Sequence, residues 1–430
     1  MKPFHIGVLV VFIIFAMLSV FVFATFSGRS GSNIGTVLIW GTIDKPIIDE
    51  ILVSVNRTFD GYDQVSYREV DEGAFISTLV EAIAAGRGPD LVLLPSTAVV
   101  NESDKLIPIS YRTVSRRNFQ DSFVESGEIF LSNDGVLGLP FYIDPFVTYW
   151  NRTLFSQGGI ARAPRYWDEL SDIAPKLSVS TSGGTLTRSA VALGEWGNIL
   201  HAKDIFISLI AGLGNPIIAQ SESGDLSVVL TEGGGTGIPP AESALRFYTE
   251  FADPVKSVYS WNRSQPLSQT AFLSGSLGVY FGQASEVFTL RESNPNLNFD
   301  IAPYPQVRGG FVAVPTDLYA LSIPRGSQNP NGSLQVALTL SGSEAQKLLV
   351  ELTGLPSVRR DVLSVSPENP YEATFRDAAL NAFVFRDPNP TETSRIFEEM
   401  IEAVSSGRLR IPEAIRSGQE ELNALLGIVR

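Results

Sequence analysis

Aromatic side chains stand beside carboxylates and hydroxyls at several places where an apolar run ends. Trp40 closes such a run, and Thr42 and Asp44 follow it. Flat rings next to polar groups can line a pocket that orients a small polar molecule. A buried structural role for Trp40 is an equally open interpretation. Comparable aromatic and polar neighbours recur at Tyr142, Asp144, Glu195, Trp196, Phe281 and Gln283.

The residues for the commonest kinds of catalysis are missing. The chain has no cysteine, which excludes disulfides, thiolate metal sites, catalytic thiols and a lipid-modified N-terminal cysteine. Apart from His5, His201 is the only histidine, so paired-histidine and histidine-cluster metal sites cannot form. No GxSxG, GxxxxGK or GxGxxG motif occurs. We therefore expect no enzyme, catalytic residue, cofactor or metal. A triad through His201 and a pair of carboxylates remain as enzymatic alternatives.

Composition narrows the class further. A chain of 430 residues exceeds what one hydrophobic core usually supports, so two lobes are expected. With 44% hydrophobic and only 18% charged residues, most of the chain should be packed. The net charge of -14, with no basic run, argues against nucleic acid as a partner.

Strand and helix patterns alternate in the first part of the chain. Strands are predicted at residues 36–40, 67–70 and 90–95, with helices after Pro46 and over residues 72–85. This alternation favours a mainly parallel α/β sheet, in which ligands bind at the carboxyl ends of the strands.

The rest of the chain reads as helix-rich over residues 151–294. Strand character returns at residues 299–303, 310–315 and 318–324. A last amphipathic helix is predicted over residues 412–426. No tandem repeat of fixed period is visible.

Several segments between residues 37 and 426 occur in an order typical of a known family. They are AIAAGRGPDLVLL (82–94), GVLGLPFYIDPFVTYWNRTLF (135–155), APRYWDEL (163–170), TAFLSGSLGVYFG (270–282), YALSIPRGSQNP (319–330), SEAQKLLVELTGLPSVR (343–359) and SGRLRIPEAI (406–415). Together they resemble the family 1 extracellular solute-binding proteins, whose best-known members capture maltose and other sugars for ABC transporters. The absence of a lipid-acceptor cysteine departs from many members.

The resemblance implies an α/β, two-lobed periplasmic-binding-protein-like fold of type II, with a mainly parallel sheet flanked by helices in each lobe. In such proteins the chain crosses between the lobes more than once. Lobe one is then expected to comprise residues 36–146 and 301–341, and lobe two residues 147–300 and 342–430. Phe141, Tyr142 and Asp144 would lie at the hinge.

The resemblance also implies a function: capture of a sugar or oligosaccharide in a cleft that closes by hinge motion, for delivery to ABC permease subunits by a monomeric protein. Ligand contacts are expected from both lobes. A tethered ligand-binding sensor and a carboxylate-pair glycoside hydrolase are the alternatives. The expected contacts are Trp40, Thr42, Asp44, Tyr142 and Asp144 from lobe one, and Glu195, Trp196, Phe281 and Gln283 from lobe two.

The N-terminus indicates export. Residues 6–26 are uncharged and almost entirely apolar, about the length that a helix needs to cross a bilayer. They favour a single-pass membrane anchor, followed by a flexible tether at residues 27–35, because the run exceeds the usual apolar core of a signal peptide. The alternative is a signal cleaved after Ala24, giving a secreted or periplasmic protein. The first residue of the mature chain distinguishes the two.

Overall fold

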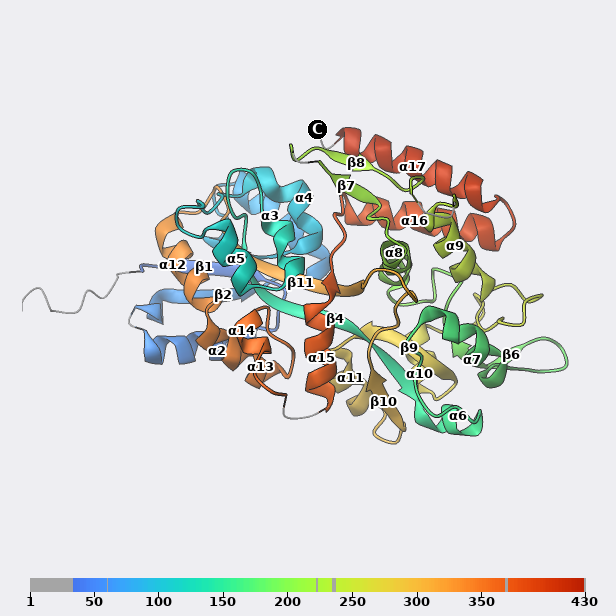
Figure 1. The fold of residues 1–430 in the computed structure, drawn as a ribbon. Helices are drawn as coiled ribbons and strands as arrows, with labels where there is room; N and C mark the ends of the chain where they lie inside the picture. The colour runs from blue at the N-terminus through green and yellow to red at the C-terminus, as the bar shows by residue number, and fades with distance from the viewer. Residues whose placement is uncertain (1–33, 60, 222, 234–236, 368–369, 429–430) are drawn as a thin grey trace, which may run out of the picture.

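The computed structural model describes residues 34–428, except residues 60, 222, 234–236 and 368–369. These residues form two bodies side by side, each with its own cluster of buried apolar side chains (Figure 1). The prediction of a two-lobed α/β fold is confirmed.

The first core surrounds a parallel group of strands. β1 (Val37–Gly41) lies between β2 (Val65–Glu69) and β3 (Leu91–Pro95), parallel to both. Helices α2 (Lys45–Thr58) and α3 (Phe75–Ala84) follow the first two strands. The predicted order of strand, helix, strand, helix and strand is confirmed. Helix α2 forms because its apolar residues recur at helical spacing, which places them on one face that packs into the core. The buried residues of this face are Ile48, Ile51, Leu52 and Val55.

The second core surrounds β9 (Leu277–Gln283) and β6 (Leu186–Val191), which pair in parallel. The long C-terminal helices α16 (Pro390–Ser405) and α17 (Ile411–Ile428) pack against each other over this core (Figure 1). Further helices of the two bodies are α5 (Arg116–Ser122), α6 (Arg152–Gln157), α7 (Leu170–Leu177), α8 (Ala202–Gly212), α9 (Pro240–Glu250), α10 (Ser268–Leu273), α12 (Pro330–Leu340), α14 (Arg360–Leu363) and α15 (Pro370–Leu380). The short strands are β5 (Val179–Ser180), β7 (Ile218–Gln220), β8 (Leu226–Val228), β10 (Phe299–Ala302) and β12 (Ala382–Phe383).

Two long strands, β4 (Leu139–Asn151) and β11 (Val314–Ser322), join the cores (Figure 1). On β4, Phe141 and Ile143 belong to the first core, whereas Phe146 and Val147 belong to the second. β4 runs antiparallel to β9, β10 and β11, and β11 runs antiparallel to β3. The expectation of mainly parallel sheets holds for β1, β2 and β3 but not for the whole: ten of the described strands form one mixed sheet, because the crossing strands run antiparallel to their neighbours, and β7 and β8 form a separate antiparallel pair.

The predicted residue limits of the two lobes stay a prediction. The burial of side chains is informative for one segment, residues 342–380. Residues 342–380, expected in lobe two, supply side chains to both cores. Ala345 and Leu349 pack in the first core, and Leu355 and Phe375 in the second.

The predicted membrane segment at residues 6–26 lies outside the described residues, as does most of the predicted tether. Among the helices that the structure describes, none combines the length and the apolar character needed to cross a membrane.

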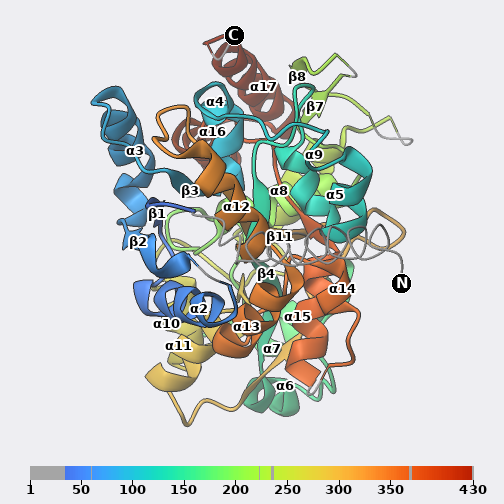
Figure 2. The same cartoon turned by 90° about the vertical axis from the view of Figure 1, so that its left-hand side faces the viewer.

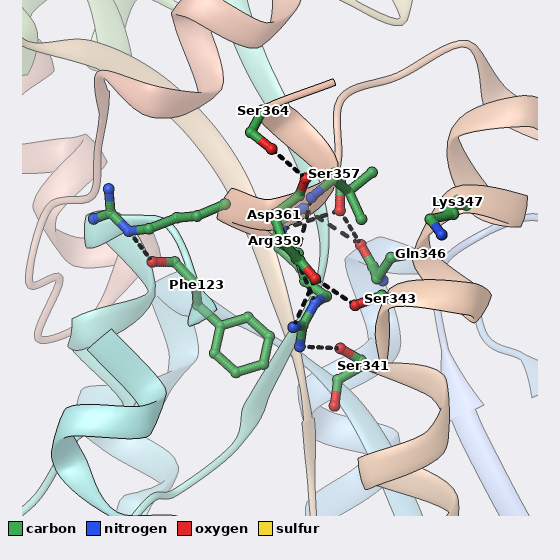
Figure 3. Close-up of polar contacts among 12 residues, drawn as sticks. Phe123, Ser341, Ser343, Gln346, Lys347, Ser357, Arg359, Asp361 and Ser364 are labelled. Carbon is green, nitrogen blue, oxygen red and sulfur yellow. Dashed lines mark hydrogen bonds and ion pairs between the residues drawn. The ribbon is translucent and has the colours of Figure 1, made fainter. Parts of the chain in front are cut away.

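A buried glutamine fastens helix α13 (Ser343–Thr353) to the first half of β4. Gln346 is fully buried, and its Nε2 donates to the Phe141 carbonyl at 2.7 Å. Its Oε1 accepts from Ser357 Oγ at 2.8 Å and from the Val358 N–H at 3.3 Å (Figure 3). One side chain thus satisfies three buried polar groups next to the strand that carries Tyr142.

Gln346→Met should lower the free energy of unfolding by about 2–4 kcal/mol, because it keeps the volume but removes the hydrogen bonds that Gln346 makes to these three buried groups. Lys347→Gln, one residue away on the exposed face of α13, is the control and should change stability by less than about 0.5 kcal/mol. Urea unfolding measures both. Equal stabilities for the two variants would contradict this role of Gln346.

Candidate ligand-binding cleft

A cavity of about 740 Å³ lies where β4, β9 and β11 cross between the two cores. The start of α2, the turn before α11 (Glu286–Ser293) and the end of α13 complete its wall. Figure 2 shows α2, α11 and α13 gathered on one side of the molecule. Both bodies therefore contribute to one cleft, which is the arrangement that a ligand bridging two lobes requires.

The centre of the cleft is a ladder of side chains on the antiparallel pair β4–β11. Tyr142 lies opposite Tyr319, and Asp144 lies opposite Asp317. Because side chains alternate between the faces of a strand, residues two apart share a face, and all four line the cavity. The two tyrosine rings meet edge to face with their centroids 5.9 Å apart. An aromatic pair and a carboxylate pair thus stand next to each other on one surface.

Burial changes the acidity of both carboxylates. Loss of solvent raises the pKa of Asp144 to about 6, although hydrogen bonds from Ser285 act in the opposite direction. The pKa of Asp317 rises to about 7, first through burial and then through the neighbouring charges of Asp204 and Asp144. Gln283 from β9 donates its Nε2 hydrogen to Asp317 Oδ2, which ties the third strand to this pair.

The turn between β9 and α11 is fixed to β4 by hydrogen bonds. The Ala284 N–H donates to the Pro145 carbonyl at 2.9 Å, and the Ser285 N–H donates to Asp144 Oδ1 at 3.0 Å. This turn places Ser285 in the cavity wall, next to Gln283 at the end of β9.

His201 lines the cavity but is already paired. Its Nε2 lies 2.9 Å from Glu286 Oε1. Burial alone would lower the pKa of His201, but Glu286, together with the charges of Asp204 and Asp317, raises it above its usual value. Burial would raise the pKa of Glu286, yet His201 and Tyr280 together lower it. The two groups stabilise each other's charged forms.

The loop after β1 enters the cavity because Gly41 allows close packing. A Cβ at Gly41 would lie 2.8 Å from the Tyr67 hydroxyl, which donates to the Ile43 carbonyl at 2.7 Å. This bond holds the loop that carries Thr42 and Asp44. Asp44 precedes α2 without capping it through its side chain, and it lines the cavity.

The structure brings five of the nine predicted contact residues to this cavity. Four predicted residues do not line it. Those in the wall are Thr42, Asp44, Tyr142, Asp144 and Gln283.

Trp40 and Phe281 are core residues instead. Trp40 is only 4% exposed and lies under the Arg68 guanidinium, 4.6 Å from the ring centroid. Its side chain belongs to the first core. Phe281 packs edge to face on Trp167, with a centroid distance of 5.0 Å, deeper in the second core than Gln283.

Glu195 and Trp196 also lie away from the cavity. Glu195 is buried, and its Oε2 pairs with Arg263 at 3.3 Å. Trp196 packs against the second core.

Sequence reasoning missed several residues of the wall. Asp317 and Tyr319 carry the same two-residue spacing as Tyr142 and Asp144, which was the one signal available in the sequence. The pairing of β4 with β11 makes that spacing meaningful, and it joins residues more than 170 positions apart. The other wall residues that were not predicted are Ile43, Ile47, Glu72, His201, Ser285, Phe288, Thr289, Leu352, Thr353 and Leu355.

The chain matches the sequence pattern of the bacterial extracellular solute-binding proteins over residues 55–375 and belongs to that family. Among curated proteins, binding proteins of Brucella abortus (strain 2308) and Brucella suis biovar 1 (strain 1330) are each 23% identical over 286 residues. The alignment covers 65% of this chain and 64% of each relative, which is just under two thirds of their length.

Solved structures share the fold. An ABC transporter solute-binding protein of Thermotoga lettingae, bound with α-D-tagatose, is 22% identical with a TM-score of 0.67, covering 91% of this chain and 100% of that one. A cyclo/maltodextrin-binding protein complexed with maltotetraose is 16% identical, with a TM-score of 0.71 and coverage of 92% and 97%. The cyclic α-maltosyl-1,6-maltose binding protein of Arthrobacter globiformis is 17% identical, with a TM-score of 0.72. The match covers 91% of this chain and 98% of that one.

The raised pKa values predict how the stability of the ligand-free protein depends on pH. In the unfolded chain these carboxyls titrate near about 4. The folded protein keeps the protons of Asp144 and Asp317 up to about pH 6 and 7. Their contribution to stability is therefore fully present below about pH 4 and is lost as the pH rises through about 7.

Asp317→Asn preserves the shape of the side chain and cannot ionise. The difference in the free energy of unfolding between this variant and the wild type should therefore shift in favour of the variant by at least about 1 kcal/mol as the pH is raised from about 5 to about 8. Asp172→Asn, on the exposed side of α7, is the control for the loss of one charge. Urea unfolding at both pH values gives the answer. A difference between Asp317→Asn and the wild type that does not change with pH would contradict the account.

Proposed function

We propose that this chain captures a sugar or oligosaccharide in the cleft between its two cores and delivers it to an ABC importer. The cleft residues that touch the ligand in this proposal are Thr42, Asp44, Tyr142, Asp144, Gln283, Phe288, Asp317 and Tyr319.

The observation that carries the proposal is the β4–β11 ladder. A sugar presents apolar C–H faces and a rim of hydroxyl groups. The rings of Tyr142 and Tyr319 suit the faces, and the oxygens of Asp144 and Asp317 accept hydrogen bonds from hydroxyls. Phe288 is 51% exposed at the mouth, where it adds a further apolar surface.

Delivery and location are parts of the same proposal. The folded part would work outside the cytoplasm, tethered through the apolar segment at residues 6–26, and would act as a monomer on permease subunits. A ligand that contacts both cores favours a closed arrangement, since β4 and β11 are the connections about which the cores can turn. If the cores close, the radius of gyration measured by small-angle X-ray scattering should be smaller with the ligand than without it.

Two alternatives remain open in this proposal. A sensor would use the same cleft but report to a membrane partner, and permease genes beside the coding gene would favour import instead. A glycoside hydrolase would use a carboxylate pair such as Asp144 and Asp317. Membership of a family of binding proteins favours capture over hydrolysis.

The test is a thermal-shift screen against monosaccharides and maltooligosaccharides, followed by calorimetry on those that raise the melting temperature. Phe288→Ala should weaken saccharide binding by about 1 kcal/mol, roughly fivefold, because it deletes an aromatic surface of the cleft. Since Phe288 is exposed, its truncation should leave the fold intact.

Phe311→Ala is the matched control, because Phe311 is 69% exposed and lies outside the cavity. Its affinity should equal that of the wild type. An equal loss in both variants, or no binding of any saccharide in the panel, would overturn the proposal. Release of shorter saccharides during incubation would favour the hydrolase instead.

A further inference from the structure

A second cavity of about 500 Å³ lies next to the cleft. That cavity lies between the segment from η3 (Ser96–Ala98) to α4 (Val99–Glu102) and the start of α16. The two cavities share one wall, made of Thr42, Glu72, Asp317 and Tyr319. Asp317 and Tyr319 of the β4–β11 ladder therefore line both cavities, so a ligand longer than one sugar ring that contacts this wall has space on either side of it.

The joined cleft is strongly acidic. Among the described residues, no lysine or arginine lines either cavity. The carboxylates in the combined lining are Asp44, Glu72, Glu102, Asp144 and Asp317.

Most of this negative charge has no positive partner in the described part of the chain. Glu102 pairs with Lys105 at 3.1 Å, and His201 is committed to Glu286. The other four carboxylates form no ion pair within the described residues. Asp144 accepts from Ser285, and Asp317 accepts from Gln283, both of which are neutral donors.

The arrangement of Asp144 and Asp317 points to what is bound there. Like charges directly opposite each other on antiparallel strands are destabilising, and here Asp144 is buried and Asp317 is partly buried. The imidazole of His201 in the same cavity lowers the pKa of both carboxyls, but burial outweighs it and the pKa of each stays raised, so a further cation between the two would relieve the remaining repulsion. The adjacent faces of Tyr142 and Tyr319 also attract cations.

An organic cation fits better than a metal ion. No group of three or more metal-ligating side chains in the described part of the chain is placed to hold a metal. An ammonium group needs only a few hydrogen-bond acceptors, which two carboxylates supply.

We propose that the ligand is a saccharide that carries a protonated amine, with the ammonium group between Asp144 and Asp317 and a sugar ring against Tyr142 and Tyr319. This inference rests on the proposed function and narrows its ligand class. The elongated cleft favours an oligosaccharide over a single ring.

Calorimetry near neutral pH tests the inference with four probes: the β-1,4-linked trisaccharide of glucosamine, its fully N-acetylated counterpart, maltotriose, and spermidine. N-acetylation removes the charge and leaves the sugar backbone unchanged. The glucosamine trisaccharide should bind at least about tenfold more tightly than its N-acetylated form, which is the scale of a charge-assisted hydrogen bond.

Asp317→Asn should abolish most of that preference, since an amide still accepts hydrogen bonds but carries no charge. Glu72→Gln removes an exposed charge at the shared wall and should reduce the preference in the same direction without risk to folding. Asp172→Asn, which removes one charge on α7 outside both cavities, should keep the preference unchanged.

The outcomes separate this inference from the proposed function. Equal or tighter binding of the N-acetylated trisaccharide or maltotriose would overturn the amine inference and leave saccharide capture standing. Binding of spermidine as tight as that of the glucosamine trisaccharide would overturn it in favour of a polyamine. If none of the three saccharides and no member of the wider panel binds, the proposed function itself fails.

Discussion

Two carboxylates that face each other across an antiparallel ladder, Asp144 and Asp317, are the constraint around which this molecule is arranged. Like charges in this position work against folding, and burial adds to the cost. The fold accommodates them through neutral donors, Ser285 and Gln283, and through protonation up to about neutral pH. Such a cost is retained at binding sites, where the ligand supplies the compensating interaction.

The rest of the structure places this ladder between two cores. β4 and β11 are long enough to pass from one core to the other, so their midpoints lie at the junction and not inside either body. The Gln346 network fastens one half of β4, and the turn before α11 fastens its middle through Ala284 and Ser285. These hydrogen bonds anchor β4 to α13 and to the turn before α11, while Tyr142 and Asp144 still line the cavity.

Sequence patterns predicted the strands and helices of the first core well, because an apolar run ends at Trp40 and apolar residues recur at helical spacing after Pro46. They also predicted Tyr142 and Asp144 at the crossing. They failed where a role depends on pairing between distant strands: Asp317 and Tyr319 gain their meaning only opposite β4. Phe281 was misplaced because the strand pattern shows which face a side chain shares but not how deep it lies.

The central claim is that the β4–β11 ladder is the ligand-binding surface. A crystal structure of the protein grown with the saccharide that binds most tightly in the panel tests it most directly. The account predicts a sugar ring against Tyr142 and Tyr319, with a polar group of the ligand within hydrogen-bond distance of Asp317. A saccharide bound outside both cavities, with this ladder exposed to solvent alone, would contradict it.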